Sequence, residues 1–345
     1  MKVQNFLVIL IFLSVSCSKN TPDNHPNSPN PCFDGVKNNG ETGVDCGGPC
    51  TACPKEWTAV TSGTTADLYS VIFFDESNGW ASGSGGTIIH TTDGGNTWSA
   101  QTSGITDTLN SISFVNSLTG YIAGTGHILK TTNGGINWSI VTTATASQSF
   151  YTILFNNASN GWVGGTDGDY PFIDNTSTGG VLWSNRYTGQ PTNQHGSIRS
   201  LDFATAYNGF AVGTEANGLS LQTADAGNTW SPLNLQAPAL LYACDFSSQT
   251  DGWATGNHNY YFATATDLWR TQTHLPDAVT LRGIKLVTTG QGWAVGNSGT
   301  VYKRSGQYEW TTVPNIATSN NLYSVWADGT NGCIVGQSGT IYILK

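Results

Sequence analysis

The stretch Leu68-Tyr-Ser-Val-Ile-Phe-Phe-Asp-Glu-Ser-Asn-Gly-Trp-Ala-Ser-Gly83 decides the fold, because the rest of the chain repeats its pattern. Related segments recur at intervals of roughly forty residues, a period typical of propellers and solenoids. They begin at Leu68, Leu109, Phe150, Ile198, Leu241, Leu281 and Leu322. Two glycines follow in every copy. The second of them is Gly83, Gly124, Gly165, Gly213, Gly256, Gly296 or Gly336.

A short apolar strand followed by a glycine turn that needs positive φ is typical of a β-hairpin. Each copy therefore predicts four short antiparallel strands, and radial repetition of such sheets makes a propeller. One sheet alone cannot bury both faces, whereas stacked neighbours can. We expect residues 55–345 to form an all-β, seven-bladed β-propeller.

The ends of this domain predict how the ring closes. The seventh copy stops at Lys345 after three predicted strands, and Glu56-Trp-Thr-Ala-Val60 supplies the missing one. We expect this N-terminal strand to complete the last blade, which removes the open sheet edges.

A second motif marks the last turn of several copies. It is clearest in Thr91-Thr-Asp-Gly-Gly-Asn-Thr-Trp98, recurs at 131–138 and 223–230, and is degenerate at 176–183. These octets resemble the Asp-box of sialidases and related propellers. We expect Asp93 and Asp225 to accept backbone N–H bonds inside their turns while the tryptophan packs on the blade, which makes them structural rather than catalytic.

Three motifs carry a wider resemblance. They are Gly-Trp-Ala-x-Gly at 79–83, Gly-Thr-Ile at 86–88 and Thr-Asp-Gly-Gly-x-Thr-Trp at 92–98. Through them residues 56–345 resemble the propeller family of the photosystem II assembly and stability factor, which binds a membrane-protein precursor. Relatives with similar boxes include hydrolases and sorting receptors, so the resemblance implies the fold more than the function.

The N-terminal residues predict export. Lys2 precedes the apolar run Phe6–Leu13, which is too short to span a bilayer and ends in Ser-Val-Ser-Cys17. Residues 1–17 resemble a bacterial lipoprotein signal, which implies acylation of Cys17 and anchoring to the outer membrane of the cell envelope; ordinary secretion is the alternative. Residues 18–30 are polar and proline-rich, and we expect a flexible linker.

Residues 31–54 form a small cysteine-rich module, similar to cysteine-glycine segments of bacterial surface proteins. Outside the cytosol its cysteines are expected to form two disulfides, with three connectivities open. These cysteines are Cys32, Cys46, Cys50 and Cys53. Calcium is one interpretation of the neighbouring acidic and amide residues, and solvated turn residues are the other. These are Asp34, Asn38, Glu41 and Asp45. We expect no other cofactor.

One column of the repeats is a candidate binding site. The second residue of each first strand lies near one mouth of the central channel in a propeller. These residues are Tyr69, Asn110, Tyr151, Arg199, Tyr242, Arg282 and Tyr323. Tyrosine and arginine are favoured at binding hot spots. The alternative is packing against neighbouring blades, because Tyr69 shares strand parity with the apolar Val71 and Phe73.

Composition and the remaining polar residues limit the function classes. With 13 Lys and Arg and a net charge of −9, the chain has no footprint for nucleic acid. We expect a monomeric, non-catalytic platform that binds an envelope or extracellular protein, or a glycan, and is not an enzyme. The alternative is a polysaccharide hydrolase using Asp202 and Asp245, with Lys285 in the same column. Cys244 and Cys333 are expected to be buried free thiols.

Overall fold

The computed structural model divides the chain into two compact units, residues 1–55 and 56–345. It describes residues 55–345 apart from 190–194, 216–217, 234, 236–238, 264–267, 272–274 and 276–278. In the first unit it describes Lys37, Glu41, Gly43, Val44, Cys46, Gly48, Cys50, Cys53 and Lys55. No described helix is long and apolar enough to cross a bilayer.

The second unit is an all-β propeller, as expected, and its strands pair into seven four-stranded antiparallel sheets. Blade 1 contains β2 (Leu68–Phe73), β3 (Gly79–Gly83), β4 (Ile88–Thr91) and β5 (Ser99–Gln101). Blade 2 contains β6 (Leu109–Phe114), β7 (Gly120–Gly124), β8 (His127–Thr131) and β9 (Ser139–Thr143). Blade 3 contains β10 (Gln148–Phe155), β11 (Gly161–Asp167), β12 (Tyr170–Thr176) and β13 (Ser184–Thr188). Blade 4 contains β14 (Gly196–Phe203), β15 (Gly209–Glu215), β16 (Leu219–Thr223) and β17 (Ser231–Pro232).

The remaining blades follow the same order. Blade 5 contains β18 (Leu241–Ser248), β19 (Asp251–Gly256), β20 (Tyr260–Ala263) and β21 (Leu268–Thr271). Blade 6 contains β22 (Leu281–Thr288), β23 (Gln291–Gly296), β24 (Val301–Arg304) and β25 (Trp310–Thr312). Blade 7 contains β26 (Leu322–Ala327), β27 (Gly332–Gly336), β28 (Ile341–Leu344) and β1 (Trp57–Val60).

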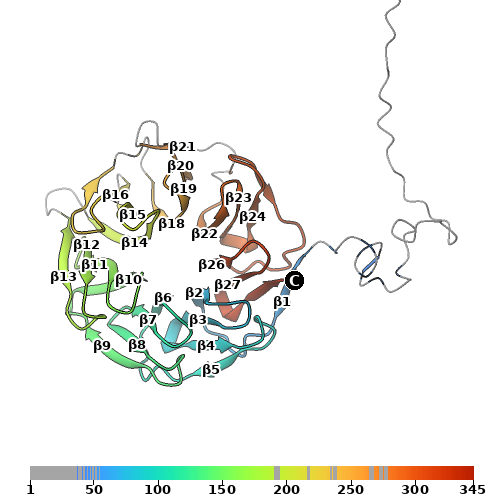
Figure 1. Cartoon of the computed structure of the whole chain (residues 1–345), viewed down its shortest axis with the longest axis horizontal. Helices are drawn as coiled ribbons and strands as arrows, with labels where there is room; N and C mark the ends of the chain where they lie inside the picture. Colours follow the sequence, from blue (N-terminus) through green and yellow to red (C-terminus); the bar gives the residue numbers. More distant parts are fainter. Residues whose placement is uncertain are drawn as a thin grey trace, which may run out of the picture. The chain divides into compact units, whose positions relative to one another are not determined.

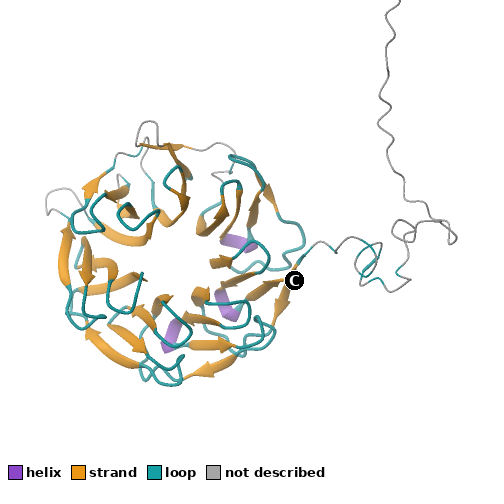
Figure 2. Cartoon of the chain, viewed as in Figure 1, coloured by secondary structure: helices purple, strands orange, loops and turns teal. Residues whose placement is uncertain are grey.

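The first strand of each blade is the inner strand of the ring (Figure 1). Each inner strand contacts those of both neighbouring blades, and β2 contacts β26 as well as β6, so the circle is closed. Three short 3-10 helices, η2 (Ser84–Gly86), η3 (Asn297–Gly299) and η4 (Gln337–Gly339), join the second and third strands of blades 1, 6 and 7. Figure 2 shows them beside the inner strands.

The hydrophobic core lies between blades rather than within them. One cluster joins Leu68, Val71 and Phe73 of blade 1 to Cys333 and Val335 of blade 7. Each blade therefore buries its apolar face only when its neighbour is present, which is what holds a propeller together.

The second glycine of each repeat is required for a different reason from the one expected. Gly83 is extended, with φ −164°, so positive φ does not select it. A Cβ at this position would instead lie 2.0 Å from the backbone oxygen of Asp67. A Cβ at Gly336 would lie 2.3 Å from the oxygen of Asn321. Glycine is needed here because the chain entering the inner strand passes too close for any side chain.

The N-terminal strand completes the last blade, as the sequence predicts. β1 pairs with β28, with Trp57 opposite Leu344 and Val60 opposite Ile341. The backbones of Glu56 and Lys345 add a reciprocal pair of hydrogen bonds at 2.9 and 3.1 Å. Trp57 is 8% exposed and packs edge-on against Trp293 of blade 6, with 5.1 Å between ring centroids.

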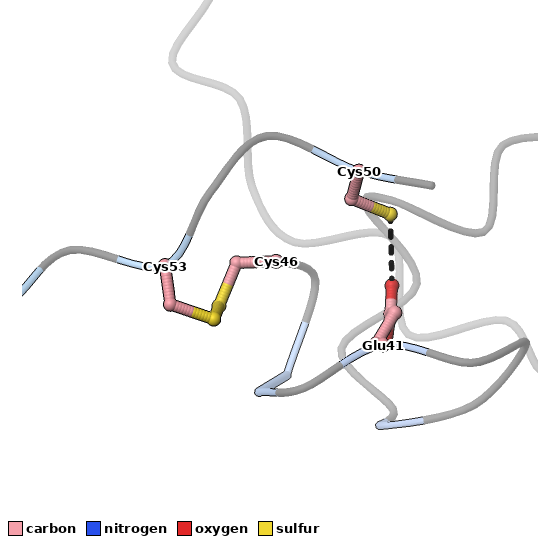
Figure 3. Close-up of a disulfide and its surroundings, with 4 residues drawn as sticks. All are labelled: Glu41, Cys46, Cys50 and Cys53. Carbon is pink, nitrogen blue, oxygen red and sulfur yellow. Dashed lines mark hydrogen bonds between the residues drawn. A yellow bond between two sulfur atoms is a disulfide. The ribbon is translucent and has the colours of Figure 1, made fainter. Parts of the chain in front are cut away.

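In the first unit, Cys46 and Cys53 form a disulfide (Figure 3). Cys50 is also disulfide-bonded, and its Sγ lies 3.2 Å from Oε1 of Glu41. A Cys46–Cys53 pair is compatible with only one of the three predicted connectivities. Cys17, Cys32, Asp34, Asn38 and Asp45 lie outside the described residues, so lipidation and the calcium interpretation stay predictions.

We predict that Trp57→Ala opens the ring. Loss of a buried tryptophan typically costs about 3–5 kcal/mol of the free energy of unfolding. Guanidinium denaturation followed by tryptophan fluorescence measures the effect. Thr58→Ala, in the same strand but exposed, is the control and should change stability by less than about 0.5 kcal/mol. Equal stability of the two variants would show that β1 does not close the propeller.

Candidate functional site

All seven inner strands carry a β-bulge at the same place. In blade 1 the pairing runs from Leu68↔Gly83 directly to Ser70↔Ser82, which leaves Tyr69 without an opposite residue. The unpaired residues of the seven blades are Tyr69, Asn110, Tyr151, Arg199, Tyr242, Arg282 and Tyr323. This set is the predicted column, which we call the bulge ring. A bulge leaves its extra residue unpaired and redirects its side chain.

The bulge overturns the parity argument for core packing. A regular strand would place Tyr69 on the face of Val71 and Phe73. The extra residue shifts that alternation, so Leu68 rather than Tyr69 is buried with Val71 and Phe73. Every member of the bulge ring is half-buried. The bulge ring therefore stands apart from the apolar core.

Four members from blades 5, 6, 7 and 1 form a continuous arc. The Arg282 guanidinium lies 5.1 Å from the ring centroid of Tyr242 and 5.6 Å from that of Tyr323. Tyr323 in turn lies 5.1 Å from Tyr69, ring centroid to ring centroid. The Nε of Arg282 donates a 2.6 Å hydrogen bond to Asn297 in η3, which fixes the guanidinium between the two tyrosines.

Blades 2 to 4 supply the other three members. Arg199 lies 3.8 Å from the centroid of the Tyr151 ring, a close cation–π contact. Its Nε is buried and has no hydrogen-bond partner among the residues that the structure describes. Asn110 donates a 2.7 Å hydrogen bond from Nδ2 to the backbone oxygen of Phe150.

The ionisation of the bulge ring follows from its surroundings. Burial raises the pKa of Tyr69, and the Asp67 carboxylate, 3.5 Å from the phenol oxygen, raises it further. The hydroxyl therefore stays neutral. The bulge ring offers two guanidinium groups held against aromatic faces, a combination suited to extended chains with both polar and apolar groups.

Below the bulge ring, side chains cap the free edges of the inner strands. Ser70 Oγ accepts from the Ile112 N–H of the next blade at 3.3 Å, and Ser111 Oγ accepts from Ile153 N–H at 3.2 Å. Ser324 of blade 7 closes the series by accepting from the N–H of Val71 in blade 1 at 3.4 Å.

Carboxylates take the same role one step further along blades 4 and 5. Asp202 accepts from the Phe246 N–H at 2.8 Å, and Asp245 accepts from the Leu286 N–H at 2.6 Å. Lys285 Nζ donates to Asp245 at 2.8 Å. Burial raises the pKa of Asp202, and it raises that of Asp245 to about 7 against the opposing effect of the Lys285 ammonium.

The hydrolase alternative depends on these two carboxylates. Both hold the neighbouring inner strand, so their observed contacts are structural. Cys244, beside them, is a buried free thiol, and so is Cys333, as the sequence predicts. Burial raises the pKa of both thiols.

The Asp-box turns are held internally. Asp93 accepts from the backbone N–H and hydroxyl of Thr97 at 2.9 and 2.7 Å and from the Thr91 hydroxyl at 2.8 Å. Asp225 has the same contacts with Thr229 and Thr223. These hydrogen bonds lower the pKa of each carboxyl to about 2. At neutral pH both carboxylates are therefore ionised and hold their own turns, which agrees with the structural role expected from the sequence.

The repeats predict that the residues of the bulge ring share one strand position, but they do not predict the bulge. Its only trace is the half-polar pair Tyr69-Ser70 between Leu68 and Val71, which breaks strict alternation. Glu41 is the one residue of the suggested calcium set that is described, and no cluster of three potential metal ligands occurs in the described part of the chain.

Comparison with known proteins gives the same fold. A family model described as photosynthesis system II assembly factor YCF48 matches residues 50–147. A structure of YCF48 bound to D1 peptide has a TM-score of 0.70 at 22% identity, covering 84% of this chain and 94% of that chain. By fold, the chain is similar to YCF48.

Two further structures extend the comparison. YCF48 from Cyanidioschyzon merolae has a TM-score of 0.69 at 19% identity, covering 84% of this chain and 98% of that one. The GH74 xyloglucanase from Xanthomonas campestris has a TM-score of 0.64 at 14% identity, covering 84% and 53%. No curated protein matches the sequence. At these identities the likeness shows the propeller alone.

We predict that Lys285→Met destabilises the propeller more at pH 8.5 than at pH 5. Without the ammonium, the folded-state pKa of Asp245 rises further above its unfolded value. The stability linked to a raised carboxyl pKa is present at low pH and lost as pH increases through the folded pKa. At pH 8.5 we expect the free energy of unfolding to fall by about 1–3 kcal/mol. This loss is smaller than that expected for a fully buried ion pair, because the Lys285 side chain is 34% exposed.

Urea denaturation at the two pH values measures this difference. Lys303→Met removes an exposed lysine that lies over Trp293, and its effect should not depend on pH. A Lys285→Met loss that is equal at both pH values would refute the charge pairing.

Proposed function

We propose that the propeller is a non-catalytic platform that binds a polypeptide at the bulge ring. The observation that carries the proposal is the bulge in all seven inner strands, which holds seven half-buried side chains, four of them tyrosine and two arginine, outside the core. The same backbone geometry recurs in all seven blades, while the side chains at this position differ. A recognition surface needs this combination, because the backbone fixes where each side chain lies and the side chain determines what it binds.

The guanidinium groups support a polypeptide partner. Arg282 is held between two tyrosines and keeps its remaining N–H groups for carbonyl or carboxylate oxygens. Arg199 has a buried Nε that lacks a partner among the described residues. The fold neighbour YCF48 was itself determined with a bound D1 peptide, which supports peptide binding as a use of this fold.

A polysaccharide hydrolase receives less support. Its candidate carboxylates, Asp202 and Asp245, both accept backbone N–H groups of the next blade. The GH74 xyloglucanase shares the fold at 14% identity. We keep a lipid anchor at Cys17 and a place in the cell envelope as proposals from the sequence, because residues 1–36 lie outside the described part.

We predict that Tyr242→Ala/Arg282→Ala weakens peptide binding. An array of short unstructured peptides identifies a binder, and calorimetry measures its Kd. Loss of hot-spot side chains costs about 2 kcal/mol or more, so Kd should rise by roughly thirtyfold.

The matched control is Tyr308→Ala/Arg186→Ala, which removes the same residue types from β13 and the β24–β25 turn. This control should leave Kd unchanged. Failure of every peptide to bind, or equal binding by the ring variant, would overturn the proposal.

A further inference from the structure

The face that each blade presents to the next has a row of three neighbouring residues on its second, third and fourth strands. In blade 1 this row is Trp80, His90 and Ser99. In blade 4 it is Phe210, Gln222 and Ser231. One of these seven rows is covered differently from the others.

Asp-box turns cover the rows of blades 1, 2 and 3. Trp80 of blade 1 donates from Nε1 to the oxygen of Gly134, in the box of blade 2. Lys130 of blade 2 donates to the oxygen of Gly179 in the box of blade 3. A Cβ on Gly227, in the box of blade 4, would lie 2.2 Å from Nε1 of Trp162 in blade 3.

Blade 7 is covered in the same way by the box of blade 1. A Cβ on Gly95 would lie 2.4 Å from Ile343 in its row. Blades 5, 6 and 7 have no box in their sequences, so the junctions before them need another cover. Between blades 5 and 6, Arg304 lies over Trp253, 5.3 Å from the ring centroid. Between blades 6 and 7, Trp57 packs on Trp293.

At the junction between blades 4 and 5, Phe246 covers the first residue of the row by stacking on Phe210, with 4.1 Å between ring centroids. The other two residues of the row, Gln222 and Ser231, line a pocket. Residues 264–267, where a box would fall, read Thr-Ala-Thr-Asp without a glycine pair and lie outside the described residues. A pocket of about 580 Å³ opens over the row of blade 4. This volume falls within the roughly 300–1,000 Å³ of small-molecule sites.

The pocket is lined mostly by polar residues, with one aromatic residue, Phe210, and one carboxylate, Asp225. Asn208, Gln222 and Gln249 are among its lining residues, and so is Phe210, which is buried. None of these three amides has a hydrogen-bond partner among the described residues. The Asp225 carboxylate is already bonded to Thr229 and Thr223.

The charge of the lining residues and the exposure of a nearby aromatic ring indicate which class of ligand the pocket suits. No lysine or arginine occurs among the described residues that line the pocket, so an anionic ligand would meet Asp225 without compensation. Tyr207, next to Asn208, is 67% exposed, and its backbone oxygen accepts from Ala226 N–H beside Asp225. An amide is both donor and acceptor, which suits vicinal hydroxyl groups, and an exposed aromatic ring suits the apolar face of a sugar.

We propose that the pocket between blades 4 and 5 binds a neutral oligosaccharide. The amides of Asn208, Gln222 and Gln249 hydrogen-bond its hydroxyl groups, and Tyr207 stacks on a sugar ring at the rim. This site is separate from the bulge ring and does not depend on the peptide-binding proposal.

The test uses the full chain and a panel of neutral hexaoses: cello-, xylo-, manno- and maltohexaose, with oligogalacturonate as the anionic arm. Calorimetry and ligand-observed NMR measure binding. We expect at least one neutral hexaose to bind with a Kd near or below about 1 mM, and oligogalacturonate to bind at least about tenfold more weakly.

Two kinds of variant locate the site. Ala224→Trp fills the pocket from an exposed position that keeps all three amides, and should abolish binding. Thr92→Trp is the matched control at the same position of the blade 1 box, and should bind as the unaltered protein does. Gln222→Ala/Gln249→Ala should raise Kd by about tenfold, as expected for loss of two hydrogen bonds.

Three results would overturn the inference: no neutral hexaose bound at about 10 mM, tenfold above the expected Kd; equal binding by Ala224→Trp and Thr92→Trp; or preference for the anionic sugar. Tyr242→Ala/Arg282→Ala should bind the hexaose normally, so failure of the bulge ring and failure of this pocket are distinguishable.

Discussion

The inner edge of each sheet presents backbone N–H groups that no strand pairs, and the fold depends on their capture by the neighbouring blade. Ser70, Ser111 and Ser324 accept these N–H groups across three of the junctions. A buried N–H without a partner costs free energy comparable to a lost hydrogen bond, so each of these hydroxyls stabilises its junction. Blades 5 and 6 have Ala243 and Gly283 at the same position, so the hydroxyl does not occur in every blade.

The bulge ring is the other side of this arrangement. Because the bulge shifts the alternation by one residue, Ser70 and its equivalents face the next blade while Leu68 stays buried in the core. The unpaired residue between them is free of both tasks. This freedom allows tyrosine, asparagine and arginine to share one backbone position without disturbing the packing of the blades.

Much of this architecture could be predicted from the sequence, since the repeated glycines mark each blade and the strand at Trp57 supplies the strand missing from the last one. The reason why glycine occupies position 83 could not be predicted, because a close backbone contact and a positive φ both require glycine and the sequence does not distinguish them. The parity of Tyr69 was misjudged because a bulge has no fixed residue requirement. The pocket over Gln222 could not be predicted, because the lack of an Asp-box leaves a pocket only where no other side chain takes its place, as Arg304 and Trp57 do at the next two junctions.

The pairing of β1 with β28 also fixes an order of events during synthesis. The strand containing Trp57 leaves the ribosome before any blade and cannot pair until Leu344 has followed. At about 5–20 residues per second the chain between them takes tens of seconds to make. Until then the ring stays open, and the four residues of β1, Trp57 among them, lack the strand with which they pair. A strand of four residues offers few unpaired backbone groups to another chain. The shortness of β1 therefore limits incorrect strand pairing before the ring closes.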